Sequence, residues 1–324
     1  MSLLSVRDLN IVFRSEHDPV RVVSSLTFDI ALAEVFGLVG ESGCGKSLTA
    51  LAVMGILPHN ANAEGEIIFQ DRNLLKLDSK AIRKLRGKEM SMIFQEPMTS
   101  LNPVLTIGYQ VSEVLTTHLH ISKKEAYEKT VALLNAVKIP SAERRIKEYP
   151  HQLSGGMRQR VMIAMAIACN PSLLIADEPT TALDVTIESQ ILALLRNLRE
   201  QRQMAILLIT HDIGVIAENA DRAAVMYAGR IVEVSRVSSL LGQPRHPYTI
   251  GLLESLPKGR GIPLKPIPGS VPRPDQLPAG CKFSDRCSYC IPACREQEPA
   301  LREIAAEHAA RCIRSEEIQW ELSI

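Results

Sequence analysis

The chain has 324 residues, of which 46% are hydrophobic and 23% charged, which predicts a soluble globular protein with one large domain and a smaller appendage. A formal net charge of +1 and an aromatic content of 4% disfavour a nucleic-acid surface, because such a surface needs excess basic charge or a base-stacking platform. No apolar run approaches the ~18 residues that cross a bilayer, and the first residues lack a signal-peptide pattern, so we expect a cytosolic protein.

The N-terminal third is predicted to be strands that lead into a helix. Alternating apolar and polar side chains indicate half-buried strands, and a continuous apolar run indicates a buried one. A proline after the first helical stretch predicts the end of that helix. The expected elements are strands at residues 3–13, 22–30, 35–39 and 66–69, a helix at 47–57 ended by Pro58, and a helix at 76–88.

Helical spacing replaces strand patterns in the middle of the chain, and residues 105–148 are interpreted as a helical insertion. Strand signals then return, and their alternation with helices predicts a mostly parallel sheet covered by helices. The expected elements are strands at 173–176 and 205–209, a helix at 187–198, and a hairpin over 224–233 that turns at Ala228-Gly229. Proline and glycine dominate residues 258–280, which predicts a linker before a cysteine-rich tail.

Residues 40–47, GESGCGKS, match the phosphate-loop pattern G-x-x-x-x-G-K-[ST] in full. The glycines allow backbone N–H groups to wrap a phosphate, and the helix that follows directs its positive end at the anion. Lys46 is expected to neutralise the β- and γ-phosphates, and Ser47 to offer a hydroxyl to Mg²⁺. Cys44 is interpreted as a small filler. The predicted nucleotide-binding residues are Gly40, Ser42, Gly43, Cys44, Gly45, Lys46 and Ser47.

The apolar run at 173–176 ends in two acids, Asp177 and Glu178. Ligands bind at the carboxyl ends of strands in α/β sheets, so these acids are candidates for catalysis. Asp177 is expected to hold Mg²⁺, directly or through water, because hard cations prefer oxygen ligands. Glu178 is expected to accept a proton from the attacking water. A strand that ends in two acids is weak evidence alone and gains weight from the phosphate loop.

Residues 153–160, LSGGMRQR, match the signature motif of the ATP-binding-cassette (ABC) family, and the chain resembles that family over roughly residues 1–255. Three further residues stand in the expected order: Gln95 resembles the Q-loop glutamine, Asp184 the D-loop aspartate, and His211 the switch histidine. Each has a plainer interpretation. Gln95 could be an ordinary loop residue, Asp184 a helix cap, and His211 a satisfied histidine at a strand end.

The resemblance implies an α/β fold with a phosphate-loop (RecA-like) core, an N-terminal antiparallel β subdomain, and a helical signature subdomain at about residues 96–165. It also implies that a second subunit's γ-phosphate faces the signature residues Ser154, Gly155 and Gly156, so that ATP joins two cassettes head to tail.

The resemblance assigns roles to further residues. His211 would contact the γ-phosphate and orient the attacking water. Gln95 would reach both the metal and the membrane partner. Asp184 would belong to the nucleotide site. Adenine usually stacks on an aromatic residue, for which Phe13 is the candidate; the alternative is that Phe13 is plain core.

Three C-terminal segments, residues 244–249 (PRHPYT), 267–272 (IPGSVP) and 280–287 (GCKFSDRC), resemble the branch that imports di- and oligopeptides, glutathione and nickel. This implies a linker at 256–280 and a small Cys-rich C-terminal extension at 281–324. The implied [4Fe-4S] ligands are Cys281, Cys287, Cys294 and Cys312. Zinc is the alternative, since thiolates suit both. The extra Cys290 allows a different set with Cys287 and Cys294.

The resemblance therefore implies the ATP-hydrolysing subunit of an importer, with ATP and Mg²⁺ as cofactors. Its implied partners are a second, different ATPase subunit, two membrane permease subunits and an extracytoplasmic solute-binding protein. It would lie peripherally on the cytoplasmic face of the inner membrane. A soluble ABC protein that acts on nucleic acid or the ribosome is the alternative, and the single cassette and the lack of a basic stripe disfavour it. The importer-like tail disfavours an exporter.

Overall fold

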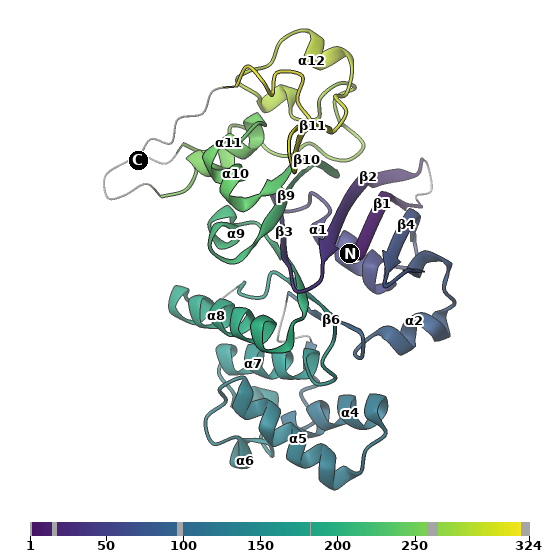
Figure 1. Cartoon of the computed structure of the whole chain (residues 1–324), viewed down its shortest axis with the longest axis vertical. Coiled ribbons are helices and arrows are strands. Elements are labelled where there is room, and N and C mark those ends of the chain that lie inside the picture. Colours follow the sequence, from purple (N-terminus) through teal and green to yellow (C-terminus); the bar gives the residue numbers. More distant parts are fainter. Residues whose placement is uncertain (1, 15–17, 96–99, 182, 258–264, 319–324) are drawn as a thin grey trace. The chain divides into compact units, whose positions relative to one another are not determined.

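The computed structural model describes residues 2–14, 18–95, 100–181, 183–257 and 265–318 (Figure 1). The chain divides into two compact units. The first unit comprises Ala31–Glu34 and Lys76–Leu207. The second comprises Ser2–Ile30, Val35–Leu75 and Leu208–Ile324.

A four-stranded sheet in the order β2-β1-β4-β5 forms the N-terminal part of the second unit. Its strands are β1 (Ser2–Phe13), β2 (Val20–Ala31), β4 (Ala61–Phe69) and β5 (Arg72–Asn73). Strand β1 is antiparallel to β4, with Leu4 opposite Phe69 and Phe13 opposite Ala61. The sequence predicted β4 too short, because its first residues are mostly polar and join the sheet through their backbone groups rather than an apolar face.

The second sheet of this unit begins with β3 (Val35–Val39), which is buried throughout and runs parallel to β9 (Arg222–Tyr227). Strand β9 forms an antiparallel hairpin with β10 (Arg230–Arg236). Its turn residues Ala228 and Gly229 have φ angles of 44° and 78°, and two positive values are what a two-residue type I′ turn requires. The predicted hairpin and its turn are confirmed.

The cysteine-rich tail continues this sheet. Strand β12 (His308–Ala310) pairs antiparallel with β10, and β11 (Arg302–Ala305) pairs antiparallel with β12. In this unit β3 and β9 pair parallel, as expected, whereas the β9-β10 hairpin and the tail strands pair antiparallel, so the sheet here is mixed. The tail also contains the short helices η3 (Ser284–Arg286) and α12 (Ala293–Glu296).

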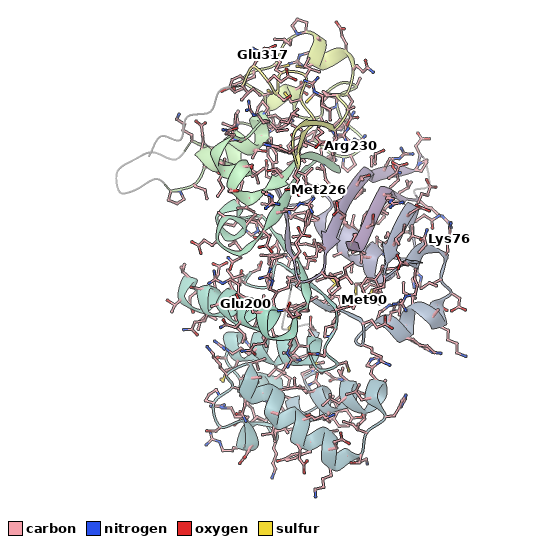
Figure 2. All side chains as sticks on the ribbon, in the orientation of Figure 1. Lys76, Met90, Glu200, Met226, Arg230 and Glu317 are labelled. Carbon is pink, nitrogen blue, oxygen red and sulfur yellow. The ribbon has the colours of Figure 1, made fainter. Side chains whose placement is uncertain are left out.

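Ion pairs around one carboxylate connect the tail to β10. Arg230, labelled in Figure 2, donates from Nε to Oε1 of Glu298 at 2.5 Å. Lys282 lies 3.4 Å and Arg311 4.0 Å from the same carboxylate. Burial alone would raise the pKa of Glu298, but the hydrogen bond and charge of Arg230 and the charges of Lys282 and Arg311 outweigh it and lower that pKa.

A second carboxylate, Glu233 on β10, is fully buried and fully hydrogen-bonded. It accepts the backbone N–H groups of Arg245 at 2.7 Å and His246 at 2.9 Å, and its Oε1 lies 2.7 Å from Nε2 of His308. A buried carboxylate is tolerated because such partners replace its lost hydration. Glu233 therefore joins β10, β12 and the segment before helix α11 (Pro247–Glu254) at one point.

The first helix of this unit, α1 (Lys46–Met54), ends three residues earlier than the sequence predicted. Gly55 adopts φ 64°, and its N–H donates to Ala52 O at 3.0 Å, so this glycine ends the helix before Pro58 can. Three further helices are too short to show a clear period in the sequence. They are α9 (Ile213–Asn219), α10 (Val237–Gly242) and α11.

The first unit is mostly helical around two parallel strands, β6 (Met90–Ile93) and β7 (Leu173–Asp177). The predicted helical insertion is present as α4 (Ile107–Leu119), α5 (Lys123–Ala136) and α6 (Ala142–Arg145). Helices α4 and α5 lie beside α7 (Gly155–Ala166) (Figure 1). The unit also contains η1 (Leu74–Lys76) at its border, α2 (Ser79–Leu85), η2 (Pro150–Gln152) and α8 (Val185–Arg202).

Strand β8 (Ala205–Thr210), buried throughout, carries the chain from the first unit to the second. Within the described ranges, no helix combines the length and apolarity that a bilayer crossing demands.

His246 should make stability depend on pH. Complete burial, with a smaller contribution from the charge of Arg311, lowers its pKa from 6.5 to about 3. Between these values the unfolded chain binds a proton that the folded chain does not, so the free energy of unfolding falls as pH falls, by at most about 1.4 kcal/mol per pH unit. His246→Asn keeps an acceptor for the Tyr248 N–H, which His246 Nδ1 accepts at 3.1 Å. Urea unfolding between pH 7 and 4.5 should show that the free energy of unfolding falls less steeply with pH in this variant than in the wild type. Equal pH dependence in both proteins would contradict the lowered pKa of His246.

Candidate functional site

The phosphate loop, residues 40–47, connects β3 to α1 in the second unit. Gly40 passes so close to β9 that a Cβ there would lie 2.0 Å from the carbonyl oxygen of Met226, a contact no side chain can make. Gly43 and Gly45 have φ angles of 80° and 105°, which favour glycine. The backbone path therefore favours glycine at the two pattern positions, Gly40 and Gly45, and also at Gly43.

The loop is also fixed by its own hydrogen bonds. Lys46 is 4% exposed, and its Nζ donates to Gly40 O at 2.6 Å and Glu41 O at 3.0 Å. The N–H of Gly229, in the β9-β10 turn, donates to Cys44 O at 3.0 Å. Burial raises the pKa of the Cys44 thiol against the opposing charge of Lys46, which fits a small packed side chain rather than a reactive thiolate.

The other nucleotide candidates of this unit lie around the loop's elements. Ser47 is half-buried in the first turn of α1, and Ser42 is exposed in the loop. Phe13 is half-buried at the end of β1. His211 is exposed directly after β8, where Asp212 caps α9 by accepting the Gly214 N–H at 2.6 Å.

In the first unit the structure brings the base candidate and the Q-loop candidate together. Asp177 ends β7 and is 4% exposed. Glu178 follows with φ 45°, a left-handed conformation that is costly for a residue with a side chain and is concentrated at functional sites. Its Oε2 accepts the Gln95 amide at 2.9 Å and the Thr181 hydroxyl at 2.8 Å. The carboxylate of Glu178 is thus held in one orientation, and Thr181 is a contact that the sequence did not reveal.

The signature residues lie at the N-terminus of α7. Ser154 caps this helix by accepting the Met157 N–H at 3.3 Å. A Cβ at Gly156 would lie 2.8 Å from Cγ2 of Ile187 on α8, whereas one at Gly155 would make an ordinary 3.6 Å contact with Leu183. Gly156 therefore lets α7 and α8 approach closely.

Asp184 caps α8 by accepting the Ile187 N–H at 2.9 Å. The plain interpretation of Asp184 as a helix cap is confirmed, and a contribution to a nucleotide site remains a prediction.

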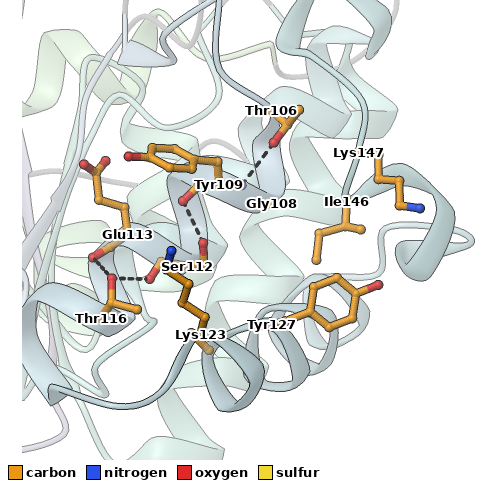
Figure 3. Close-up of a pocket in the computed structure, with 11 residues that line it drawn as sticks. Thr106, Gly108, Tyr109, Ser112, Glu113, Thr116, Lys123, Tyr127, Ile146 and Lys147 are labelled. Carbon is orange, nitrogen blue, oxygen red and sulfur yellow. Dashed lines mark hydrogen bonds between the residues drawn. The ribbon is translucent and has the colours of Figure 1, made fainter.

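A cavity of about 540 Å³ lies between α4 and α5 of the first unit (Figure 3). Tyr109, Tyr127 and Ile146 point into it, and none of the predicted site residues lines it.

The tail cysteines gather around one small cavity of about 10 Å³ between η3, α12 and the end of the described chain. All are free thiols, and burial is the largest cause of the raised pKa of Cys287, to about 12, and of Cys312, to about 11. Across residues 2–318, gaps excepted, no three or more His, Cys, Asp or Glu side chains are arranged as a metal site. The predicted ligand set is therefore not arranged as a metal site in this part of the chain. The lining cysteines are Cys281, Cys287, Cys290, Cys294 and Cys312.

Comparison with known proteins agrees with this geometry. The sequence profile described as "ABC transporter" matches residues 23–181, and the one described as "Oligopeptide/dipeptide transporter, C-terminal region" matches residues 232–294. The chain is 50% identical to a probable peptide ABC transporter ATP-binding protein of Sinorhizobium fredii, over 98% of this chain and 96% of the relative. The chain belongs to the ABC transporter ATP-binding family.

Other relatives in this family also match over more than 90% of the chain. The oligopeptide transport ATP-binding protein AppD of Bacillus subtilis is 49% identical, with 98% of each chain covered. The oligopeptide transport ATP-binding protein OppD of Salmonella typhimurium is 48% identical, over 92% of this chain and 89% of its own. The resemblance seen in the sequence is confirmed, and the enzyme is an ABC-type ATPase.

A solved structure has a similar fold. The dimeric ABC cassette MJ0796 in a post-hydrolysis state with ADP and Pi is similar with a TM-score of 0.65 and 26% identity, over 72% of this chain and 98% of that chain. The mixed α/β cassette fold with two sheets is therefore confirmed.

Two residues that the sequence marked only as subfamily features contact the phosphate loop of this ABC ATPase. Tyr248 accepts the Glu41 N–H at 2.9 Å, and Arg286 lies 3.0 Å from the Glu41 carboxylate. Both belong to the C-terminal segments that resemble the peptide-importer branch. That resemblance is the only sequence feature that could have pointed to these two residues.

Two glycine variants test the loop geometry. Gly40→Ala should lower the free energy of unfolding by about 3 kcal/mol, because its methyl group meets the fixed carbonyl of Met226. A Cβ at Gly43 would meet no other atom. Gly43→Ala should therefore lower the free energy of unfolding by only about 1 kcal/mol, because of the left-handed backbone at this position. Denaturant unfolding followed by circular dichroism gives both values, and equal losses would contradict the close approach of Gly40.

Proposed function

We propose that this ABC ATPase energises the uptake of di- or oligopeptides, or of a related small solute. The proposal rests on the extent of the sequence similarity. Relatives named for peptide or oligopeptide transport match across 98% of the chain, including its C-terminal region. No described feature favours action on nucleic acid or the ribosome.

The residues of the second unit are proposed to bind the triphosphate. The backbone N–H groups of residues 40–47 and the N-terminus of α1 would surround the phosphates, and Lys46 would neutralise the β- and γ-phosphates. The loop contacts of Lys46 are to carbonyl oxygens, which an anionic phosphate can replace. Phe13 is the proposed adenine contact.

Hydrolysis is proposed to use Asp177, Glu178 and Gln95 of the first unit together with Ser47 of the second. Ser47 and Asp177 present a hydroxyl and a carboxylate, the hard oxygen donors that suit Mg²⁺, and bound Mg²⁺ would neutralise charge on the phosphates. Glu178 would accept a proton from the attacking water while the P–O bond to the γ-phosphate breaks. Gln95 and Thr181 hold the Glu178 carboxylate, so its orientation is set before the water arrives.

Hydrolysis is proposed to be coupled to dimer closure. Ser154, Gly155 and Gly156 lie at the N-terminus of α7, where helical N–H groups attract an anion held by another cassette. Asp184 and His211 are proposed to complete that site. The dimeric MJ0796 structure with ADP and Pi supports this arrangement by similarity.

The chain is proposed to work with two permease subunits and an extracytoplasmic solute-binding protein, on the cytoplasmic face of the membrane. We further propose that its second cassette is a different chain. The mass and subunit composition of the purified importer test that point, since two copies of this chain would contradict it. The proposed boundaries are residues 1–255 for the ATPase, 256–280 for the linker and 281–324 for the extension, with the helical subdomain at 96–165.

Glu178→Gln tests the proposed base. Hydrolysis by the assembled importer should fall by about 10²–10⁴-fold, because glutamine cannot accept the proton. ATP binding should persist, since glutamine keeps an oxygen acceptor for Thr181. Phosphate release and nucleotide affinity give the two readouts.

Two controls separate the roles. Glu188 on α8 also accepts a threonine hydroxyl, that of Thr180 at 2.7 Å, and serves as the matched control. The Glu188→Gln variant should retain hydrolysis. Lys46→Ala should weaken nucleotide binding itself. Normal turnover by the Glu178→Gln importer would remove Glu178 from the role of base.

We also infer that the extension binds a [4Fe-4S] cluster through Cys281, Cys287, Cys294 and Cys312. Its donor chemistry supports this, because free thiols line one cavity and thiolates bind iron–sulfur clusters.

Metal analysis of the chain purified without oxygen tests this inference. We expect about four iron and four sulfide per chain with broad visible absorbance, lost in Cys281→Ser and retained in the control Cys169→Ser. One equivalent of zinc without iron would favour the zinc alternative and contradict the cluster.

A further inference from the structure

The phosphate loop is attached to the C-terminal segment through a residue that its sequence pattern leaves free to vary. Glu41 is the first x of G-x-x-x-x-G-K-S. Its two carboxylate oxygens lie 3.0 and 3.1 Å from Nη1 of Arg286. Its backbone N–H donates to the Tyr248 hydroxyl at 2.9 Å, and its carbonyl accepts from Lys46 at 3.0 Å. Side chain, N–H and carbonyl of this one residue are all engaged.

Arg286 is itself fixed from several directions. Its side chain is 7% exposed. Its Nε donates to Pro268 O at 2.7 Å and its Nη2 to Gly269 O at 3.4 Å, so the preceding proline-rich segment holds the far side of the guanidinium. A planar guanidinium with fixed donors transmits position more sharply than a flexible ammonium does.

An aromatic cluster supports both contacts to Glu41. Tyr227, Tyr248 and Phe283 are buried, with ring centroids 4.7 to 5.4 Å apart. The Arg286 guanidinium lies 5.7 Å from the centre of the Tyr227 ring and 5.9 Å from that of Phe283. Tyr227 belongs to β9, so this cluster joins the sheet of the cassette to the tail.

The two halves of the phosphate loop are thus held by different parts of the chain. Gly229, in the β9-β10 turn, holds the second half at Cys44. Tyr248 and Arg286, from segments more than 200 residues away along the chain, hold the first half at Glu41.

We propose that Arg286 is a positioning residue for nucleotide binding, through which the C-terminal segment sets the path of the first half of the phosphate loop. This inference rests on the proposed function, because it concerns affinity for MgATP. Arg286 acts through Glu41 rather than on the nucleotide. Loss of this contact should move the N–H groups of the loop, and small displacements of positioned groups have large effects on binding and catalysis.

The test compares MgATP affinity and loop protection in full-length variants. Arg286→Gln should weaken MgATP binding about tenfold and speed amide hydrogen exchange in residues 40–45, while kcat at saturating ATP changes less than KM. Arg286→Lys, which keeps the charge without the planar fork, should restore part of the affinity. Glu41→Gln should weaken binding similarly, and the double variant should be no weaker than Arg286→Gln alone, because both changes break one contact.

The matched control is Arg295→Gln, which breaks an exposed pair with Asp285 at 2.6 Å in the same segment and should leave affinity unchanged. Unchanged affinity and loop exchange in Arg286→Gln and Glu41→Gln, even with lower thermal stability, would overturn the inference. Additive losses in the double variant would overturn it as well. If Arg286→Gln does not fold, the MgATP affinity and loop exchange of the isosteric Glu41→Gln variant decide between these outcomes. Wild-type chain that binds no MgATP would instead overturn the proposed function.

Discussion

The close approach of the phosphate loop to β9 is the constraint on which the rest of this structure depends. Gly40 leaves no room for a side chain against the Met226 carbonyl, so the loop must leave β3 along one path and enter α1 at Gly45. That path directs the start of α1 toward the loop, which is how an anion site is made from backbone alone. The β9-β10 turn and the tail then fasten the loop at Cys44 and Glu41.

Binding and hydrolysis are assigned to groups on different units, and this division suits a coupled ATPase. The second unit provides the phosphate loop, whereas the first provides Asp177, Glu178 and the signature helix. In the proposed mechanism closure takes place between two cassettes, and ATP that bridges them lowers the free energy of the closed dimer. The left-handed backbone at Glu178 and its contacts to Gln95 and Thr181 hold the carboxylate of this proposed base in one orientation.

The sequence was sufficient where the determinants are local. The glycines of residues 40–47, the Ala228-Gly229 turn and the two acids at the end of β7 each follow from a few adjacent residues, and all lie where expected. It was insufficient where residues far apart meet. The Glu178–Gln95 contact spans 83 residues and the Glu41–Arg286 contact 245, and no local pattern encodes either. The tail strands were missed for the same reason, since they are short and depend on pairing with β10.

The central claim is that residues 40–47 form a prebuilt anion site that closes on MgATP. Amide hydrogen exchange over the full chain, with and without MgATP, measures this most directly. We expect residues 40–49 to show the largest slowing of exchange when MgATP is added. Unchanged exchange in those residues, with nucleotide in excess, would contradict it.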